Sequence, residues 1–281
     1  MSSLFDFGKA PDLYAVMGNP VSHSKSPQIH AAFARQTRQH IEYRAIQVDE
    51  GGFAQAVGNF QANDGKGLNV TVPFKQEAWQ LVNERSALAD QAGAVNTIIF
   101  RDNNHLYGDN TDGIGLVRDL TINHGCVLHH KRILIMGAGG AVRGVLAPLL
   151  DEQPALLTIV NRTVEKAVTL ARDFAGAIPV VACGYESLEG QFDIIINGTS
   201  ASLHGQLPPL AAMSLAAQCW CYDMMYGHAQ TVFLDWAEQQ GVAQRVDGLG
   251  MLVEQAAASF ELWRGVRPDT APVIETLRGQ R

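Results

Sequence analysis

The chain has 281 residues, which is long enough for two domains of about 100–150 residues each. Hydrophobic residues make up 47% and charged residues 17%, a balance typical of a protein that buries a core and not of a disordered chain. The formal net charge is -7 and no basic stripe occurs, which argues against nucleic acid as a partner.

The sequence shows no targeting or membrane pattern. Residues 1–11 lack the charged and then apolar order of a secretory signal, and no run of about 18 or more apolar residues occurs. The four cysteines are Cys126, Cys183, Cys219 and Cys221. The last two are spaced too tightly for a C-x-x-C redox pair, and no second pair completes a zinc site. We therefore expect no metal, no membrane partner, and buried thiols in a cytoplasmic protein.

The first part of the chain has a mixed α/β pattern. Strands are predicted at Leu13–Met17, Tyr43–Val48, Gly67–Val70 and Val95–Phe100, the last pairing with His105–Tyr107 across a turn. Ser26 is predicted to cap a helix that runs to Arg38, with Pro27 at its first position. Further helices are predicted between the second and third strands and over Glu77–Val82 and Glu84–Ala92.

From Asp112 onward, helices and strands alternate regularly. The predicted elements are a helix at Ile114–Asn123, a strand at Arg132–Met136, a helix at Ala141–Leu150, a strand at Leu157–Val160, a helix at Val164–Phe174, and strands at Ile178–Val181, Phe192–Asn197 and Cys219–Tyr222. This alternation predicts a parallel sheet with right-handed crossovers. Pro148 lies within a predicted helix and is expected to kink it or to shorten its last turn.

The end of the chain is helical again, at Thr231–Gln240, Met251–Trp263 and Ala271–Leu277. We expect the last two helices to return to the first domain. Clusters of turn formers at 108–113 and 247–250 mark the two predicted crossings between domains. The resulting division places residues 1–111 and 249–281 in one domain and residues 112–248 in the other.

A glycine-rich turn is the first candidate for a ligand site. The predicted strand at Ile133–Met136 runs into Gly137-Ala138-Gly139-Gly140-Ala141 and then a helix. Such a turn lets backbone N–H groups approach a pyrophosphate at the positive end of a helix. Two positions of G-x-G-x-x-G/A match, whereas the third is Val142, so a tight turn without a ligand is the alternative. Arg143 is either a solvated residue or a pyrophosphate contact.

The next strand ends in Asn161-Arg162-Thr163. An acidic residue at this place would bind a ribose 2′-hydroxyl, whereas an arginine suits a 2′-phosphate. Lys166 lies one helical turn further on, where it either adds charge near the phosphate or is an ordinary surface lysine. The two segments together predict a dinucleotide site for NADP.

Two further clusters carry groups for acid–base and anion chemistry. Lys75 follows directly after a predicted strand, where a lysine can reach a ligand crevice and donate a proton, or is simply a surface charge. Asp112 either orients that ammonium group or caps the helix after it. Ser24 and Ser26 are hydroxyl donors at a helix start, suited to a carboxylate or to capping.

Nine motifs appear in a fixed order along the chain. They are Gly18-Asn19-Pro20, His23-Ser24-Lys25-Ser26-Pro27, Asn69-Val70-Thr71-Val72-Pro73-Phe74-Lys75, Gly93-Ala94-Val95-Asn96-Thr97, Gly108-Asp109-Asn110-Thr111-Asp112-Gly113, Gly137-Ala138-Gly139-Gly140-Ala141, Asn161-Arg162-Thr163, Tyr222-Asp223-Met224 and Asp247-Gly248-Leu249-Gly250-Met251-Leu252. This order resembles the biosynthetic, NADP-dependent shikimate dehydrogenases, from Tyr14 to about Pro272.

The resemblance implies an N-terminal α/β substrate domain and a Rossmann-type, doubly wound parallel-sheet domain for NADP(H). It implies reversible, NADPH-dependent reduction of 3-dehydroshikimate to shikimate in aromatic amino-acid biosynthesis, with Lys75 and Asp112 as the catalytic pair. The implied substrate contacts are Ser24, Ser26, Thr71, Asn96, Tyr226 and Gln255. For the cofactor, the resemblance implies that Met224 and Gly248 lie near the nicotinamide. It implies that the 2′-phosphate is surrounded by Asn161, Arg162, Thr163 and Lys166.

Where this chain has Lys166 the family often has arginine, which predicts weaker discrimination between NADP and NAD. Two other functions stay open at this point. One is an NAD-using quinate/shikimate dehydrogenase of broader specificity, which Arg162 and the Ser24/Ser26 pair disfavour. The other is a non-catalytic NADP-binding sensor, which needs neither Lys75 nor Asp112. The sequence leaves the choice between a monomer and a homodimer open.

Overall fold

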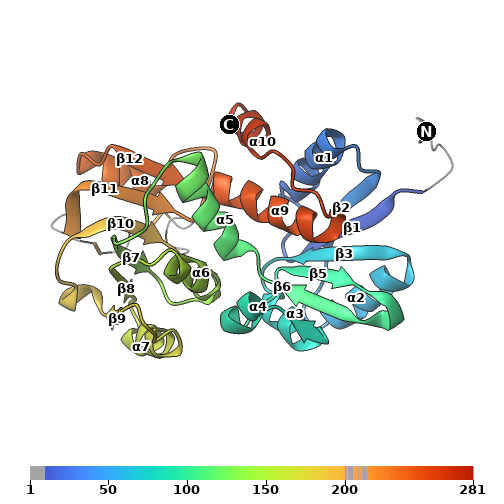
Figure 1. The fold of residues 1–281 in the computed structure, drawn as a ribbon, viewed down its shortest axis with the longest axis horizontal. Helices are drawn as coiled ribbons and strands as arrows, with labels where there is room; N and C mark the ends of the chain where they lie inside the picture. Colours follow the sequence, from blue (N-terminus) through green and yellow to red (C-terminus); the bar gives the residue numbers. More distant parts are fainter. Residues whose placement is uncertain (1–9, 200, 202–204, 208, 211–213, 281) are drawn as a thin grey trace.

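The computed structural model describes residues 10–199, 201, 205–207, 209–210 and 214–280. The chain forms two lobes, each built around a six-stranded sheet (Figure 1). Strands β1 to β6 form the first sheet and strands β7 to β12 form the second. This arrangement confirms the predicted mixed α/β fold.

The first sheet has the strand order β2-β1-β3-β5-β6-β4. Its strands are β1 Asp12–Gly18, β2 Ile41–Gln47, β3 Gly65–Val70, β4 Glu84–Arg85, β5 Thr97–Phe100 and β6 Leu106–Asp109. Its helices are α1 Ser26–Thr37, α2 Phe53–Ala62, α3 Lys75–Leu81 and α4 Ala87–Ala92. Strand β1 is parallel to β2 and β3, whereas β5 is antiparallel to both β3 and β6, as predicted for the last pair.

The second sheet is parallel throughout, with the order β12-β11-β10-β7-β8-β9. Its strands are β7 Arg132–Met136, β8 Leu156–Val160, β9 Val180–Cys183, β10 Phe192–Asn197, β11 Leu215–Asp223 and β12 Gln244–Asp247. Its helices are α6 Gly140–Asp151, α7 Val164–Asp173 and α8 Val232–Gln239. This is the doubly wound order, in which the strand order reverses between β7 and β10, and ligands bind outside the carboxyl ends of the strands at that point.

Some element predictions were wrong. Glu84 and Arg85 form β4 beside β6 instead of opening a helix, and the short polar edge strand β12 was missed. Both strands exist through pairing with a neighbour, which local sequence does not encode. Pro148 does not shorten its helix, because α6 continues to Asp151.

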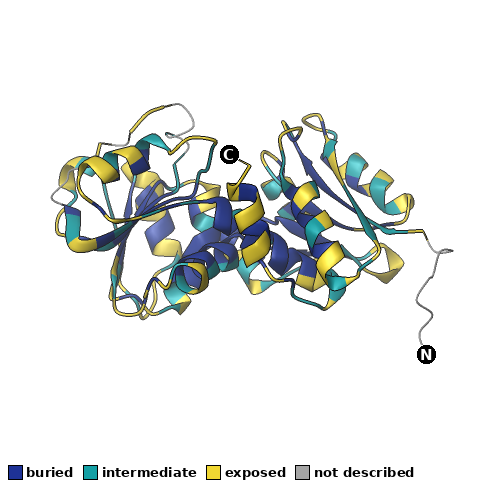
Figure 2. Cartoon of the chain, turned by 90° about the horizontal axis from the view of Figure 1, so that it is seen from above, coloured by how far each residue is buried: buried dark blue, intermediate teal, exposed yellow. Residues whose placement is uncertain are grey.

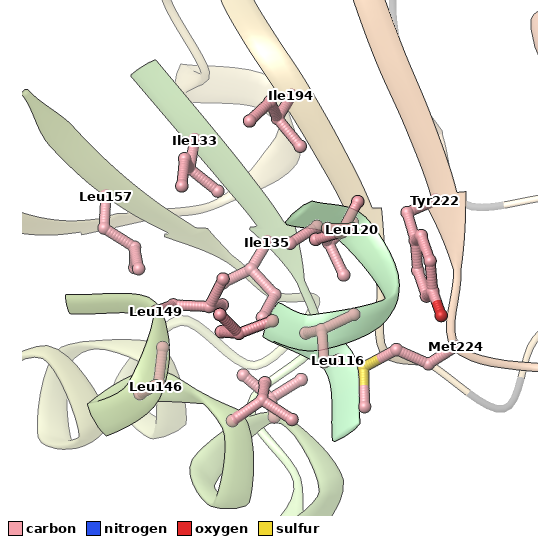
Figure 3. Close-up of a cluster of buried hydrophobic side chains, with 14 of the residues drawn as sticks. Leu116, Leu120, Ile133, Ile135, Leu146, Leu149, Leu157, Ile194, Tyr222 and Met224 are labelled. Atoms are coloured by element: carbon pink, nitrogen blue, oxygen red, sulfur yellow. The ribbon is translucent and has the colours of Figure 1, made fainter. Parts of the chain in front are cut away.

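The core of the second lobe lies between its sheet and the helices that cover it. Figure 3 shows Ile133, Ile135 and Ile194 on the strands, facing Leu116 and Leu146 on the helices. All five side chains are essentially inaccessible to solvent. Burying such a side chain contributes about 1.5–3 kcal/mol each, so this layer fixes the sheet that carries the glycine turn.

Two helices run between the lobes, α5 Asp112–Arg118 and α9 Leu249–Arg264 (Figure 1). They approach closely where α5 carries Gly115, since a Cβ there would lie 2.8 Å from the Met251 carbonyl oxygen. Figure 2 shows the centre of the molecule, where these helices lie, as mostly buried. Because both helices contact both lobes, they fix how the two sheets face each other.

The C-terminal helices return to the first lobe, as predicted. Helix α9 buries Val253 and Phe260 against Ile29 and Phe33 of α1, and α10, Ala271–Arg278, adds Leu277 to the same cluster. Between α5 and β7 the chain takes one π-helical segment, Asp119–Asn123, where an uninterrupted helix to Asn123 was predicted.

Candidate active site

A cavity of about 330 Å³ lies where the carboxyl ends of β1 and β3 face α9 and the loop after β11. Both predicted catalytic residues and all six predicted substrate contacts line it: Lys75, Asp112, Ser24, Ser26, Thr71, Asn96, Tyr226 and Gln255. Met224 and Gly248, which were expected beside the nicotinamide, line the same cavity. The structure therefore brings together ten residues that the sequence scatters over more than half the chain.

Lys75 and Asp112 form an ion pair inside this cavity. Lys75 is the first residue of α3 and Asp112 is the first residue of α5, and Lys75 Nζ donates to Asp112 Oδ2 at 2.6 Å. The two side chains are 28% and 13% exposed, so the lysine is no ordinary surface charge. An ammonium group has three N–H donors, and the bond to Asp112 leaves two for a ligand in the cavity.

Asp112 is held from its other side as well. Asn96 Nδ2 donates to Asp112 Oδ1 at 2.8 Å, and Asn96 Oδ1 accepts from the Thr111 backbone N–H at 3.0 Å. Thr111, not Asp112, occupies the N-cap position of α5, so the carboxylate is not a helix cap. Both carboxylate oxygens are thus engaged, and charge-assisted hydrogen bonds of this kind contribute about 1.5–3 kcal/mol each.

The start of α1 supplies donors for an anion. The helix begins at Ser26 and its N-cap is Lys25, so the prediction of Ser26 as the cap was wrong. Instead, Ser24 Oγ accepts from the Ser26 backbone N–H at 3.2 Å. Two hydroxyls and the positive end of a helix therefore meet at the cavity wall, which favours a carboxylate there.

A buried aromatic layer supports this wall from behind. His30 stacks on Tyr43 with ring centroids 4.1 Å apart, and complete burial lowers the pKa of His30 to about 3. The Tyr43 hydroxyl donates to Asn69 Oδ1 at 2.8 Å, and burial raises the pKa of Tyr43 well above its ordinary value. Both groups are therefore uncharged and act as rigid packing beneath a polar surface.

The glycine turn has the geometry of a phosphate site. Gly137 has φ +106°, a conformation that favours glycine, and its N–H bonds the Val160 carbonyl at 2.8 Å, so the turn is fixed to β8. Open space lies where a Cβ on Gly139 or Gly140 would point. No side chain caps the start of α6, so its first N–H groups have no side-chain partner. Ala141 is the exposed second residue of the helix.

A second cavity of about 370 Å³ extends from this turn along α7. Ala138, Gly139, Gly140, Arg143 and Lys166 line it, whereas Gly137, Ala141 and residues 161–163 do not. Arg143 is bound to Asp173, with Nη1 and Oδ2 2.7 Å apart. This carboxylate neutralises the charge of Arg143. The role of Arg143 as a pyrophosphate contact stays a prediction.

The end of β8 offers free positive charge. Arg162 and Lys166 are both exposed, and no carboxylate in the described part of the chain pairs with either within 4.0 Å. Asn161 Nδ2 donates to the Thr163 carbonyl at 2.8 Å and thereby shapes the loop that carries Arg162. Burial raises the pKa of Tyr185 to about 12, and the charge of nearby Arg162 opposes that rise. An unpaired guanidinium at the end of β8, the strand beside the one that leads into the glycine turn, fits a phosphate group.

Some residues of the site were not predicted from the sequence. Asn69 lines the cavity and receives the Tyr43 hydroxyl, although only its motif was noted. Ser259 of α9 lies behind the cavity with its side chain fully buried. Its spacing of four residues from Gln255 was a usable signal, because residues four apart share one helix face.

Neither a metal centre nor a membrane span is present among the described residues. No three histidine, cysteine or acidic side chains in this part of the chain gather to hold an ion. No helix there is long and apolar enough to cross a bilayer. The thiols of Cys126, Cys219 and Cys221 are buried and free, whereas Cys183 is only partly covered.

Comparison with known proteins identifies the family. Residues 16–98 match the family model of the shikimate dehydrogenase substrate binding domain. Residues 121–205 match the shikimate / quinate 5-dehydrogenase family, and residues 248–278 match the shikimate 5'-dehydrogenase C-terminal domain. Together these segments span both lobes.

Relatives that match nearly the whole chain point to the same family. The chain is 59% identical over 267 residues to shikimate dehydrogenase (NADP(+)) of Hahella chejuensis, covering 95% of this chain and 98% of that protein. Among solved structures, an Ael1 enzyme from Pseudomonas putida has a TM-score of 0.91 at 47% identity, covering 95% and 98% of the two chains. Shikimate 5-dehydrogenase from Thermus thermophilus, in complex with NADP(H) and shikimate, has a TM-score of 0.83 at 29% identity, covering 95% and 99%. The chain belongs to the shikimate dehydrogenase family.

Proposed function

We propose that this chain catalyses the reversible, NADPH-dependent reduction of 3-dehydroshikimate to shikimate in aromatic amino-acid biosynthesis. The observation that carries the proposal is the Lys75–Asp112 pair, 2.6 Å apart in a cavity that Met224 and Gly248 of the lobe with the doubly wound sheet also line. Relatives named shikimate dehydrogenase (NADP(+)) at 52–59% identity support it.

The fit of the polar groups supports this substrate. A carboxylate binds at Ser24 and Ser26, at the positive end of α1. The ring hydroxyls bind to Thr71, Asn96 and Gln255, which are uncharged donors and acceptors around the cavity. A hydroxyl that finds a partner here is favoured strongly over an analogue that leaves the buried site group unpaired.

The residues present also fit NADP(H). Gly137 to Ala141 and the start of α6 hold the pyrophosphate, with Arg143 at the side of the groove. Asn161, Arg162, Thr163 and Lys166 would hold the 2′-phosphate, and Met224 and Gly248, which line the substrate cavity, would contact the nicotinamide. When bound, the cofactor supplies the hydride that the ketone carbon accepts.

The protein supplies the proton. As the carbonyl carbon is reduced, its oxygen gains negative charge, and Lys75 Nζ donates a proton to it. Asp112 holds the ammonium group in place during reduction, and Asn96 fixes the carboxylate. In the reverse direction Lys75 takes the hydroxyl proton, so the same pair serves both directions.

The proposed domain organisation follows from where the substrate contacts and the cofactor contacts lie in the chain. We assign residues 1–111 and 249–281 to the substrate domain and residues 112–248 to the NADP domain, since all substrate contacts except Tyr226 come from the first set of residues and all cofactor contacts come from the second. The chain acts as a monomer or a homodimer. The free thiols suit a reducing compartment, which supports a cytoplasmic enzyme.

Replacement of the lysine tests the proposal. For Lys75→Ala we expect kcat to fall about 10²–10⁴-fold, the scale of lost acid catalysis, while the Kd for NADPH is unchanged. Lys66→Ala is the matched control, because Lys66 is an exposed lysine of β3 outside the cavity. Unchanged turnover in Lys75→Ala would remove the lysine from the mechanism.

A further inference from the structure

A run of buried polar side chains lies directly behind the catalytic pair. Asn69, Asn96, Thr97, Thr111 and Ser259 are each at most 6% exposed, and they come from β3, β5, the turns beside β5 and α5, and α9. Buried polar groups are costly unless they are hydrogen-bonded. Because these five side chains contact one another, they form a network that is stable only when every member has a partner.

Ser259 is the point where this network meets α9. Its Oγ lies 2.7 Å from Thr97 Oγ1 and accepts from Asn69 Nδ2 at 2.9 Å. It also lies 3.3 Å from Thr111 Oγ1 and donates to the Gln255 carbonyl oxygen at 3.1 Å. One serine hydroxyl thus joins two strands, the start of α5 and the helix that carries Gln255.

Two donors hold the side-chain oxygen of Asn96. The shortest side-chain donor to Asn96 Oδ1 is Thr97 Oγ1, at 2.8 Å, and the Thr111 backbone N–H donates to the same oxygen at 3.0 Å. Ser259 Oγ contacts the Thr97 hydroxyl from its other side, at 2.7 Å. Asn96 then accepts at Oδ1 and must present its NH₂ to Asp112 Oδ1, at 2.8 Å.

We propose that Ser259 is a positioning residue for proton transfer, which holds the Thr97 hydroxyl on Asn96 Oδ1, the atom that the Thr111 backbone N–H also binds, and so keeps Asp112 and Lys75 in line. The inference rests on the proposed function. Ser259 touches neither substrate nor cofactor: the cavity wall includes Asn69, Asn96 and Gln255 but not Ser259. Its effect on the reaction is therefore entirely indirect.

Ser259→Ala removes the hydroxyl with little change in volume. We expect kcat for 3-dehydroshikimate reduction to fall about 10- to 100-fold, as expected when reacting groups lose alignment, with the Kd for NADPH unchanged. The solvent deuterium isotope effect on kcat rises, because the misaligned proton transfer becomes slower relative to the other steps. Ala258→Gly is the control, since it weakens the same helix without touching the network.

Thr97 provides a second test that does not depend on the folding of Ser259→Ala. Thr97→Val removes the next hydroxyl in the run and keeps the side-chain shape, whereas Thr97→Ser keeps the hydroxyl. The Val variant should reproduce the kcat loss and the larger isotope effect, and the Ser variant should not. If Ser259 acts through Thr97, the double variant Ser259→Ala/Thr97→Val loses no more than the larger single loss.

Two results would overturn the inference. One is a Ser259→Ala enzyme that is folded and retains the kcat and the isotope effect of the natural chain. The other is a double variant whose losses multiply. Failure of the natural chain to reduce 3-dehydroshikimate would instead count against the proposed function, so the two failures are distinguishable.

Discussion

At the scale of single residues, chemistry depends on which charges are already neutralised. Lys75 and Arg143 each have a carboxylate partner, at 2.6 and 2.7 Å, whereas Arg162 and Lys166 have none among the described residues. Lys75 keeps two donors free inside a cavity, whereas Lys166 lines the groove of the open glycine turn and Arg162 lies at the end of the neighbouring strand β8. The first arrangement suits proton transfer, and the second suits a phosphate group.

The unpaired arginine makes a clear prediction about cofactor choice. For Arg162→Ala we expect KM for NADPH to rise about 10- to 100-fold, which corresponds to the loss of one charge-assisted bond of about 1.5–3 kcal/mol. KM for NADH should stay unchanged, since NADH has no 2′-phosphate. Arg172→Ala, an exposed arginine in the last turn of α7, is the control. Equal effects on both cofactors would show that Arg162 does not read the 2′-phosphate.

At the scale of secondary-structure elements, one buried carboxylate joins three segments. Glu254 of α9 is fully buried and accepts from Arg118 Nε at 2.9 Å, Arg267 Nη2 at 2.8 Å and Thr270 Oγ1 at 2.6 Å. Burial alone raises the pKa of Glu254, but the Thr270 hydrogen bond and the Arg118 bond and charge outweigh it, so its pKa is lowered. The end of α5 and the loop before α10 are thereby fixed to α9.

The lowered pKa of Glu254 gives a pH dependence with a definite sign. The folded chain binds the proton less readily than the unfolded chain, so this stabilisation is complete above the ordinary pKa of 4.5 and is lost as pH falls through the lower folded value. We expect Glu254→Gln to lower the free energy of unfolding at pH 7 by about 2–3 kcal/mol. This loss of unfolding free energy is smaller than the loss expected for a fully buried ion pair, because the Arg118 side chain is 36% exposed.

Urea unfolding measured from pH 7 to pH 3 checks this expectation. The difference between Glu254→Gln and the natural chain should shrink as the pH falls. Thr276→Ala, which removes an exposed hydroxyl of α10, is the control. A difference that stays constant over the whole pH range would show that the ionised form of Glu254 is not what holds these segments.

Local patterns predicted most of the elements, and the reasons for the failures are physical. The strand Arg132–Met136 was predicted with the observed bounds, because a buried parallel strand has a continuous apolar run. By contrast, β4 has two residues and β12 is polar, so only pairing with β6 and β11 makes them strands. Ser26 and Asp112 were considered as caps from local sequence, whereas each is the first residue of its helix.

The candidate site was predictable where motifs carry it and not where tertiary contacts do. Lys75 and Asp112 were paired by chemistry and resemblance, and their ion pair confirms that they meet. Ser259 carries no motif, and its contacts with Asn69 and Thr97 join positions more than 160 residues apart. Such a network exists only after α9 has packed on the first sheet.

At the scale of the whole molecule, the substrate cavity takes residues from both ends of the chain and from the loop after β11. Helices α5 and α9 run between the lobes, and two short turns precede them, at residues 110–111 between β6 and α5 and at Gly248 between β12 and α9. Ligands that contact both sheets favour a closed arrangement, since only closure lets them make all their contacts. The turns are the expected hinges.

Solution scattering tests this expectation. With NADP and shikimate together, we expect a smaller radius of gyration than for the free chain, and slower hydrogen exchange in the two hinge turns. NADP alone is the control, because it reaches mainly one sheet. Superimposable profiles and unchanged exchange rates would show that the lobes do not close on their ligands.

The most direct test of the central claim is steady-state kinetics of the purified chain with shikimate and quinate, each with NADP and NAD. The account predicts that kcat/KM is highest for shikimate with NADP, and that quinate and NAD are each poorer by at least about tenfold, the effect of about 1.4 kcal/mol. Equal efficiency with NAD would contradict the cofactor assignment. No turnover of shikimate with either cofactor would contradict the proposed function itself.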